Sequence, residues 1–322
     1  MRVRYGPAIA FGAIGLGSIL WGVFAPAQPQ PFALAAAVLP VAILLAVRER
    51  LGGTLRLTAG VGGAVIGVLV ALLSHGLVLG FAYLFFLGFA DQAAALLESL
   101  SIDPKLTTVL GSPWSLLLLA ELVLVAPLTE ETGKAFGAVL SRPTDRRSAF
   151  LAGVTAGTGF AIVENLLYAS FLSVPWNAIL LARSLGSAVH PLAAGLVMVG
   201  WWEWRQGHGL SALGRRFLAG AGVHALWNGS LVVLTVTETA FVVGAASERF
   251  AQVSLVYSAA LGAVLAAGLW QVSRSVAVNR EQLAALDLRQ GSTVGAWTVL
   301  AASFLLPVAM LLLAFPDFYR VG

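Results

Sequence analysis

The residues of this chain best suited to chemistry are two adjacent glutamates and a lysine, Glu130, Glu131 and Lys134. All three lie within an apolar run over residues 113–140 that is long enough to cross a bilayer as one helix. An ionisable side chain at the centre of a bilayer costs about 2.5–3.5 kcal/mol on insertion scales, so such groups usually pair or serve a function. A carboxylate there can accept a proton from water, which is the first step of a hydrolytic reaction.

Further polar side chains occur in the next three apolar runs, over residues 148–173, 178–201 and 217–236. They are Glu164, Asn165, Arg183, His190, His224 and Asn228. At a helix rise of about 1.5 Å per residue, the two glutamates, both histidines and Glu164 lie roughly 10–24 Å from the inner ends of their runs. We therefore predict that four neighbouring helices bring these groups into one cavity between the inner third and the midplane of the membrane.

Helical spacing predicts how these side chains are arranged within each run. Glu130 and Lys134 are four residues apart and should pair on one helix face. Glu131, rotated by about 100°, is then the freer carboxylate for water or a metal ion. The same four-residue spacing joins two further pairs, Phe160 with Glu164 and His224 with Asn228.

Three other polar residues are expected to lie outside this cavity. Arg183, near the outer end of its run, should extend toward the membrane surface or pair with an acidic group such as Glu121. His75 and Glu121 are interpreted as structural. Small residues in the fifth and sixth runs would permit close backbone approach; they are Gly153, Gly157, Gly159, Gly186 and Gly195.

Two kinds of hydrolytic site are compatible with these side chains. In one, a glutamate acts as general base, histidines donate hydrogen bonds and an amide such as that of Asn228 stabilises an oxyanion. In the other, glutamates and histidines hold Zn²⁺, which activates a water; the candidate ligands are Glu131, Glu164, His190 and His224. The chain has no cysteine, which excludes thiol nucleophiles, cysteine-ligated metals and disulfides.

The composition is that of an integral membrane protein. Hydrophobic residues make up 59% of the 322 residues, charged residues only 11%, and the mean hydropathy is +0.89. A soluble domain carries roughly 25% charged residues. Nine apolar runs are long enough to span a bilayer, over residues 7–27, 31–47, 59–88, 113–140, 148–173, 178–201, 217–236, 251–273 and 293–315.

The cations between these runs alternate between rich and poor loops, which predicts an inside N-terminus and an outside C-terminus. This pattern explains the net charge of +4 without nucleic-acid binding. No internal repeat or long linker occurs, so we predict an all-α helical bundle forming a single membrane domain over residues 1–322, with its catalytic core at 113–236. The first run, which ends at Ala25-Pro26-Ala27, also resembles a signal peptide, but it is longer than the usual apolar region of one, so we expect it to be retained.

Four motifs, each on its own run, resemble the PrsW family of multi-spanning membrane proteases. They are Glu130-Glu131-x-x-Lys134, Phe160-x-x-x-Glu164-Asn165, His190 followed by Gly195, and His224-x-x-x-Asn228. That family is related to the CAAX prenyl endopeptidases and bacteriocin-immunity proteins, whose corresponding patterns are EExxxR, FxxxH and HxxxN. The resemblance covers residues 113–236.

The resemblance implies roles for these residues. Glu130 or Glu131 would activate the attacking water, and Glu164 stands where the relatives have histidine, so a carboxylate-only site and a zinc site both remain open. The other expected roles are metal binding or polarisation for His190 and His224, oxyanion stabilisation for Asn228, and support of the site for Lys134, Phe160 and Asn165.

The resemblance also implies a substrate and a location. The substrate would be a membrane-anchored protein, such as an anti-sigma-factor-like protein with one span, and the enzyme would lie in the cytoplasmic membrane of a bacterium. Two alternatives from other classes remain. Intramembrane glutamates and histidines also form the proton relays of transporters, and the same fold could serve as an inactive scaffold.

Overall fold

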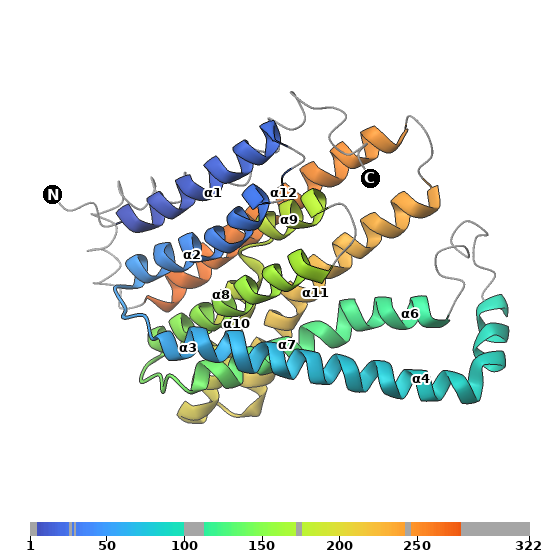
Figure 1. Ribbon diagram of the computed structural model, residues 1–322. Helices are drawn as coiled ribbons and strands as arrows, with labels where there is room; N and C mark the ends of the chain where they lie inside the picture. The colour runs from blue at the N-terminus through green and yellow to red at the C-terminus, as the bar shows by residue number, and fades with distance from the viewer. Residues whose placement is uncertain are drawn as a thin grey trace.

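The structure, a computed structural model, describes residues 5–25, 28, 30–99, 113–171, 176–241 and 246–277. Within these residues the secondary structure is helical throughout, and Figure 1 shows the long helices running side by side along the molecule. The first half contains α1 (Gly6–Phe24), α2 (Gln30–Leu51), α3 (Leu57–Gly62), the π-helical turn η1 (Gly63–Gly67), α4 (Val68–Ser99), α6 (Pro113–Ala120), the π-helical turn η2 (Glu121–Val125) and α7 (Ala126–Val139). The second half contains α8 (Arg146–Phe171), α9 (Trp176–Leu185), α10 (Val189–Glu203), the π-helical turn η3 (Trp204–His208), α11 (Leu210–Phe241) and α12 (Ala246–Val276).

The all-α prediction is confirmed for the described residues, whereas the count of nine spans is not. In the part of the chain that the structure describes, six helical segments are long and apolar enough to cross a membrane: Gly6–Phe24, Gln30–Leu51, Leu57–Leu84, Arg146–Tyr168, Leu210–Ala240 and Arg249–Val276. A seventh arises if Ile179–Leu185 and Val189–His208, which are bent by 42° at their junction, form one span. The run over 113–140 is divided into α6, η2 and α7 and is not among these. The run over 293–315 lies outside the described residues.

Three connections that contain arginines, α2–α3 with Arg56, α7–α8 with Arg142 and α10–α11 with Arg205, lie at one end of the bundle, on the left of Figure 1. Arg56 Nη1 donates to Arg142 O at 3.3 Å, and Arg147 Nη1 donates to Leu51 O at 3.0 Å. The first bond connects the loop before α3 with the turn before α8, and the second connects the first turn of α8 with the last residue of α2. This clustering agrees with the alternation of rich and poor loops; which membrane face this end occupies remains a prediction.

Helix α8 lies at the centre of the bundle and contacts α2, α3, α7, α9, α10 and α12. Its glycines allow the close packing that the sequence predicted. A Cβ atom added at Gly153 would lie 2.3 Å from Ala194 O, and one added at Gly157 would lie 2.3 Å from His190 O. The backbones of α8 and α10 are therefore in direct contact, which fixes the position of His190.

Candidate active site

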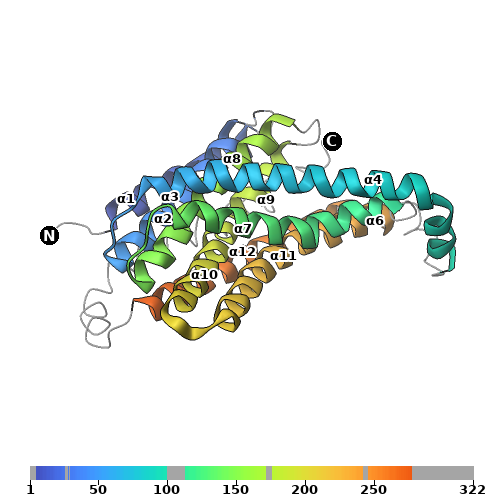
Figure 2. The same ribbon diagram turned by 90° about the horizontal axis from the view of Figure 1, so that it is seen from below.

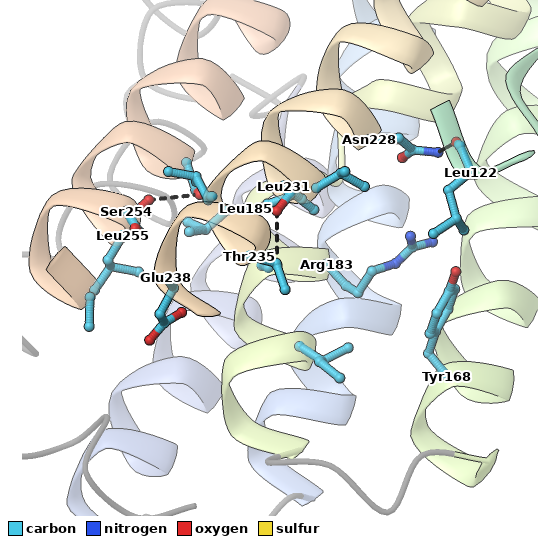
Figure 3. Close-up of a pocket in the computed structure, with 16 residues that line it drawn as sticks. Leu122, Tyr168, Arg183, Leu185, Asn228, Leu231, Thr235, Glu238, Ser254 and Leu255 are labelled. Atoms are coloured by element: carbon cyan, nitrogen blue, oxygen red, sulfur yellow. Dashed lines mark hydrogen bonds between the residues drawn. The ribbon is translucent and has the colours of Figure 1, made fainter. Parts of the chain in front are cut away.

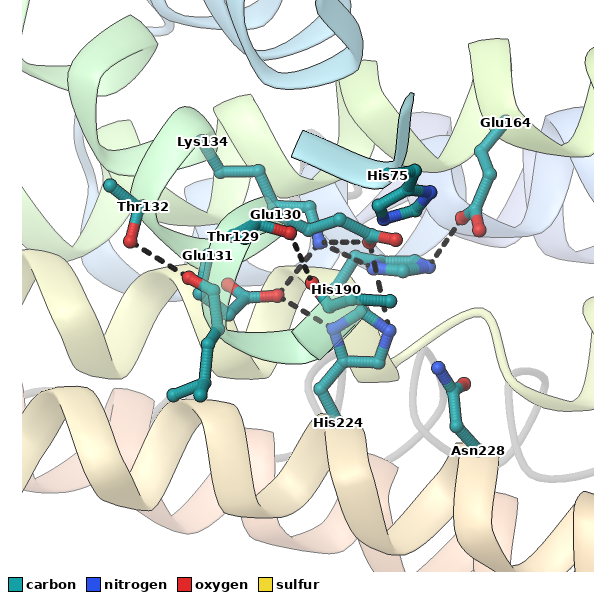
Figure 4. A network of polar contacts seen from close by, with 12 residues as sticks. His75, Thr129, Glu130, Glu131, Thr132, Lys134, Glu164, His190, His224 and Asn228 are labelled. Carbon is teal, nitrogen blue, oxygen red and sulfur yellow. Dashed lines mark hydrogen bonds and ion pairs between the residues drawn. The ribbon is translucent and has the colours of Figure 1, made fainter. Parts of the chain in front are cut away.

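Lys134 is the centre of a buried polar network. It lies on α7 with no exposed surface, and its Nζ atom contacts three groups. The distances are 2.7 Å to Glu131 Oε1, 3.2 Å to Glu130 Oε2 and 2.8 Å to His190 Nδ1 (Figure 4). An ammonium has three hydrogens and no acceptor. All three hydrogens are therefore used, and we assign the ring proton of His190 to Nε2.

The two glutamates share this lysine, so the prediction that Lys134 pairs with Glu130 and leaves Glu131 free of it is wrong. Residues three apart on a helix are neighbours as well as residues four apart, and Lys134 Nζ lies nearer to Glu131 than to Glu130. Glu131 Oε1 also lies 3.0 Å from His224 Nδ1. The second oxygen of Glu131, Oε2, is buried and has no hydrogen-bond partner.

Glu130 and the two histidines form the group best suited to hold a metal. One ligand atom from each of Glu130, His190 and His224 lies within 4.8 Å of the others, and the three residues are 4%, 5% and 1% exposed. The two imidazole rings meet edge to face with their centroids 4.7 Å apart. Two histidines and one glutamate are a ligand set found in catalytic zinc sites. Of the predicted ligands, Glu131 and Glu164 are not in this group, and Glu130 joins it instead.

A second set of ion pairs surrounds His190. His190 Nε2 lies 2.9 Å from Glu164 Oε2, and Arg183 Nη2 forms an ion pair with the same oxygen. Arg183 Nε donates to Asn165 Oδ1 at 2.7 Å, and Asn165 Nδ2 donates to Ala36 O at 2.7 Å. Glu164 therefore accepts from α9 and from α10, and Asn165 connects this set to α2.

Arg183 does pair with an acidic group, as one of its two predicted alternatives had it, but the group is Glu164 of α8 and not Glu121. Glu121 instead lies 3.3 Å from His75, as Glu121 Oε1 to His75 Nε2. Neither of these two atoms has a hydrogen bond. The pair joins η2 to α4 and is separate from the lysine network.

Phe160 and Asn228 lie at the edges of the network. The Phe160 ring covers the lysine ammonium, with Lys134 Nζ 4.0 Å from the ring centroid, a cation–π contact. Asn228 Nδ2 donates to Leu122 O in the turn η2 at 3.0 Å. Figure 4 shows Asn228 one turn along α11 from His224 and outside the ion pairs.

Two larger cavities border the network. The α4–α8 cavity has a volume of about 360 Å³, and its lining residues are Val68, Ala71, Leu72, His75, Glu130, Phe160, Glu164, Leu167 and Tyr168. The α11–α12 cavity has a volume of about 330 Å³ and contains Arg183, Tyr168 and Asn228 at one end and Glu238 and Ser254 at the other (Figure 3). Tyr168 lines both cavities. Of these two cavities, the α4–α8 cavity is the one lined by the glutamates Glu130 and Glu164.

Sequence reasoning missed the part that Arg183 plays. Arg183 and His190 are seven residues apart, which in one straight helix would place them two turns from each other. The turn between α9 and α10 brings both side chains onto Glu164 instead. No spacing signal indicates that turn; the adjacent polar residues Glu164 and Asn165 were the only sign that a partner was needed.

A bundle of long apolar helices that buries carboxylates, histidines and a lysine in one network defines a polytopic membrane protein with an interior polar site. The PrsW-protease family model, described as PrsW family intramembrane metalloprotease, matches residues 57–258. The match covers more than half of the chain, so the chain belongs to this family. It extends the resemblance from the four motif-bearing runs to α3, η1 and α4 on one side and to the first part of α12 on the other. No curated protein and no solved structure matches the chain.

Proposed function

We propose that this protein hydrolyses a peptide bond of a membrane-anchored protein within the bilayer, at a zinc ion held by Glu130, His190 and His224. The observation that carries the proposal is the convergence of these three buried side chains from α7, α10 and α11. The family match supports the reaction class. A zinc ion bound there would polarise the substrate carbonyl and acidify a water.

The types of donor atom present fit such an ion, and binding it would require the Lys134 ammonium to leave Glu130 Oε2 and His190 Nδ1, the atoms that it contacts in this structure. Imidazole nitrogen and carboxylate oxygen are zinc ligands, and a site with three protein ligands leaves one position for water or substrate. Glu131 Oε1 accepts from His224, which is the carboxylate support that metal-binding histidines usually have. Glu164 supports His190 in the same way.

In this mechanism Glu131 is the general base. Lys134 and His224 hold its Oε1, and the unpartnered Oε2 is left to accept the proton of the attacking water. The same oxygen can return that proton to the leaving amine nitrogen, so the carboxylate ends the cycle as it began. Asn228 uses one amide hydrogen for Leu122 O and has a second for the oxyanion of the substrate.

A glutamic form of the same protease is the second candidate, and the position of Lys134 favours it. Its ammonium already contacts Glu130 and His190, two of the three proposed ligands. In that form the lysine supplies the positive charge, and the two adjacent glutamates activate water without a metal. Metal content decides between the two forms.

The substrate and the location follow from the family. We propose a protein with a single span, such as an anti-sigma-factor-like regulator, and the cytoplasmic membrane of a bacterium. The α4–α8 cavity supports an apolar polypeptide segment as the substrate. Most of its lining is apolar, and a segment that entered it would contact Glu130 and Glu164.

The test uses the full-length protein purified in detergent, with zinc measured per chain and cleavage measured on single-span reporter proteins. We expect about one zinc per chain, with zinc and cleavage both lost after chelation and in His190→Ala and His224→Ala. The matched control is His208→Ala, at an exposed histidine in η3. Cleavage that persists in the zinc-free protein would establish the glutamic form, and absence of cleavage of every reporter would contradict the proposed function.

A further inference from the structure

The α4–α8 cavity is lined by side chains from one face of α4 and one face of α8. Its α4 residues, Val68, Ala71, Leu72 and His75, follow the spacing of a single helix face, and so do its α8 residues, Phe160, Glu164, Leu167 and Tyr168. Glu130 of α7 completes the lining. The cavity therefore lies between α4 and α8, with a proposed zinc ligand in its wall.

The cavity begins where close packing of the chain against α8 ends. A Cβ atom added at Gly63 would lie 2.1 Å from Ala156 O, so η1 and α8 are in backbone contact. At Gly67 the added atom would instead lie 2.9 Å from the Phe160 ring, a side-chain contact. Val68, the next residue, is the first residue of the cavity. Figure 2 shows α4 continuing from this point along the outside of the bundle beside α7.

The lining is apolar on the outer side and acidic on the inner side. Leu72 is 57% exposed on the outer surface of α4, whereas Ala71 beside it is 6% exposed. The two carboxylates of the cavity are already paired, Glu130 with Lys134 and Glu164 with Arg183. An acidic substrate side chain would be repelled by these carboxylates, and most of the remaining lining is apolar.

We propose that the α4–α8 cavity is the pocket that binds one large apolar side chain of the substrate, such as leucine, methionine or phenylalanine, next to the cleaved bond. The proposal rests on the proposed protease function and adds its specificity. The volume of about 360 Å³ is at the small end of the range of about 300–1,000 Å³ for ligand pockets, which suits one side chain with its backbone rather than an intact helix. The wall that contains Glu130 places this side chain beside the proposed reaction centre.

The experiment compares cleavage preferences of the purified full-length protein on a mixed peptide library, with the residues beside each cleaved bond identified by mass spectrometry. We expect enrichment of large apolar residues at one flanking position. Ala71→Phe fills the cavity and should lower the ratio of large to small residues at that position by roughly tenfold, since size differences in an apolar pocket discriminate by about 10–200-fold. Leu167→Ala enlarges the cavity and should admit tryptophan there.

The matched control is Ala251→Phe. Ala251 is as buried as Ala71, at 6% exposed, but it lines the α11–α12 cavity. This variant should retain the parent preference. An unchanged preference in both Ala71→Phe and Leu167→Ala, with cleavage intact, would overturn the pocket while leaving the protease function in place. A change of cleavage preference in Ala251→Phe alone would indicate that the α11–α12 cavity is the specificity pocket.

A binding measurement tests the pocket independently of turnover. A peptide with one photoreactive leucine is irradiated with the parent protein, and the cross-linked segment is identified. We expect cross-links to α4 within residues 68–75 that fall several-fold in Ala71→Phe and persist in Ala251→Phe. Cross-links to other segments, or cross-linking of this site by a photoreactive phospholipid that excess peptide does not displace, would overturn the proposal. Failure of the protease function would instead appear as cross-linking without cleavage.

Discussion

The Nζ atom of Lys134 and the Nδ1 atom of His190 lie 2.8 Å apart, joining α7 to α10 inside the bundle. The same ammonium bonds both glutamates of the Glu130-Glu131 pair. One cation therefore stabilises two adjacent carboxylates and fixes the orientation of an imidazole. This arrangement explains how two glutamates can lie on a helix that the sequence otherwise suggests should be apolar.

We predict that Lys134→Met strongly destabilises the protein. The substitution keeps the side-chain length and removes the charge, leaving two buried carboxylates without their common cation. Breaking a buried ion pair on one side costs about 3–5 kcal/mol. The midpoint of thermal unfolding in detergent should fall well below that of the parent.

Arg215→Met is the control for Lys134→Met, because Arg215 is an exposed cation on α11. Substitutions at such surface positions usually change stability by no more than about 0.5 kcal/mol. Equal midpoints for the two variants would contradict a stabilising role for the buried lysine.

We predict that glutamine substitutions at the two glutamates have different effects on zinc content and cleavage. Glu130→Gln should lose zinc and cleavage together, because Glu130 belongs to the group of three ligands. Glu131→Gln should retain zinc and lower turnover by about 10²–10⁴-fold, the usual contribution of a general base. Zinc analysis and reporter cleavage on the same preparations measure both effects.

Glu238→Gln serves as the control for this pair, since Glu238 is an exposed glutamate of α11 and should retain both zinc and cleavage. If Glu131→Gln cleaves reporters as fast as the parent, the general base is another residue. If Glu130→Gln keeps its zinc, the ligand assignment is wrong.

The ion pair between Arg183 and Glu164 should show strong coupling in a double-mutant cycle. Arg183→Met leaves Glu164 without its cation, and Glu164→Gln leaves Arg183 without its anion. Removing both should cost less than the sum of the single changes, with a coupling of about 0.5–3 kcal/mol. Unfolding midpoints of the three variants give the cycle, and additive effects would show that the pair does not hold the bend between α9 and α10.

The composition and the four motifs were sufficient to predict the all-helical fold and most members of the buried polar network. Glutamates, histidines and a lysine are costly in apolar runs unless they meet and pair, and the histidines His190 and His224 do meet in the structure. The motifs also led to the correct family. These features depend on residue type and order along the chain, which a single sequence contains.

Which polar side chains pair with each other could not be predicted, because the pairing depends on how the helices bend and rotate. Spacing alone assigned Lys134 to Glu130, whereas the lysine reaches Glu131 as well. The turn before α10 brought Arg183 to Glu164, a contact between residues on different helices. The α4–α8 cavity likewise has no sequence signature, because it results from the end of close glycine packing at η1 and not from a motif.

The glycine contact between η1 and α8 leads to the last prediction, that Gly63→Ala damages both stability and cleavage. A Cβ atom at Gly63 would lie 2.1 Å from the backbone oxygen of Ala156, which cannot rotate away, so the two helices must separate. Overpacking of this kind costs about 1–3 kcal/mol.

Gly76→Ala on α4 is the matched control: a Cβ atom there has no neighbour within 4 Å, and helix propensity favours alanine by about 1 kcal/mol. Separation at Gly63 would also alter the α4–α8 cavity beyond it, so Gly63→Ala should reduce reporter cleavage more than its loss of stability explains. Equal unfolding midpoints and equal cleavage rates for the two alanine variants would show that this contact neither holds the bundle together nor shapes the cavity.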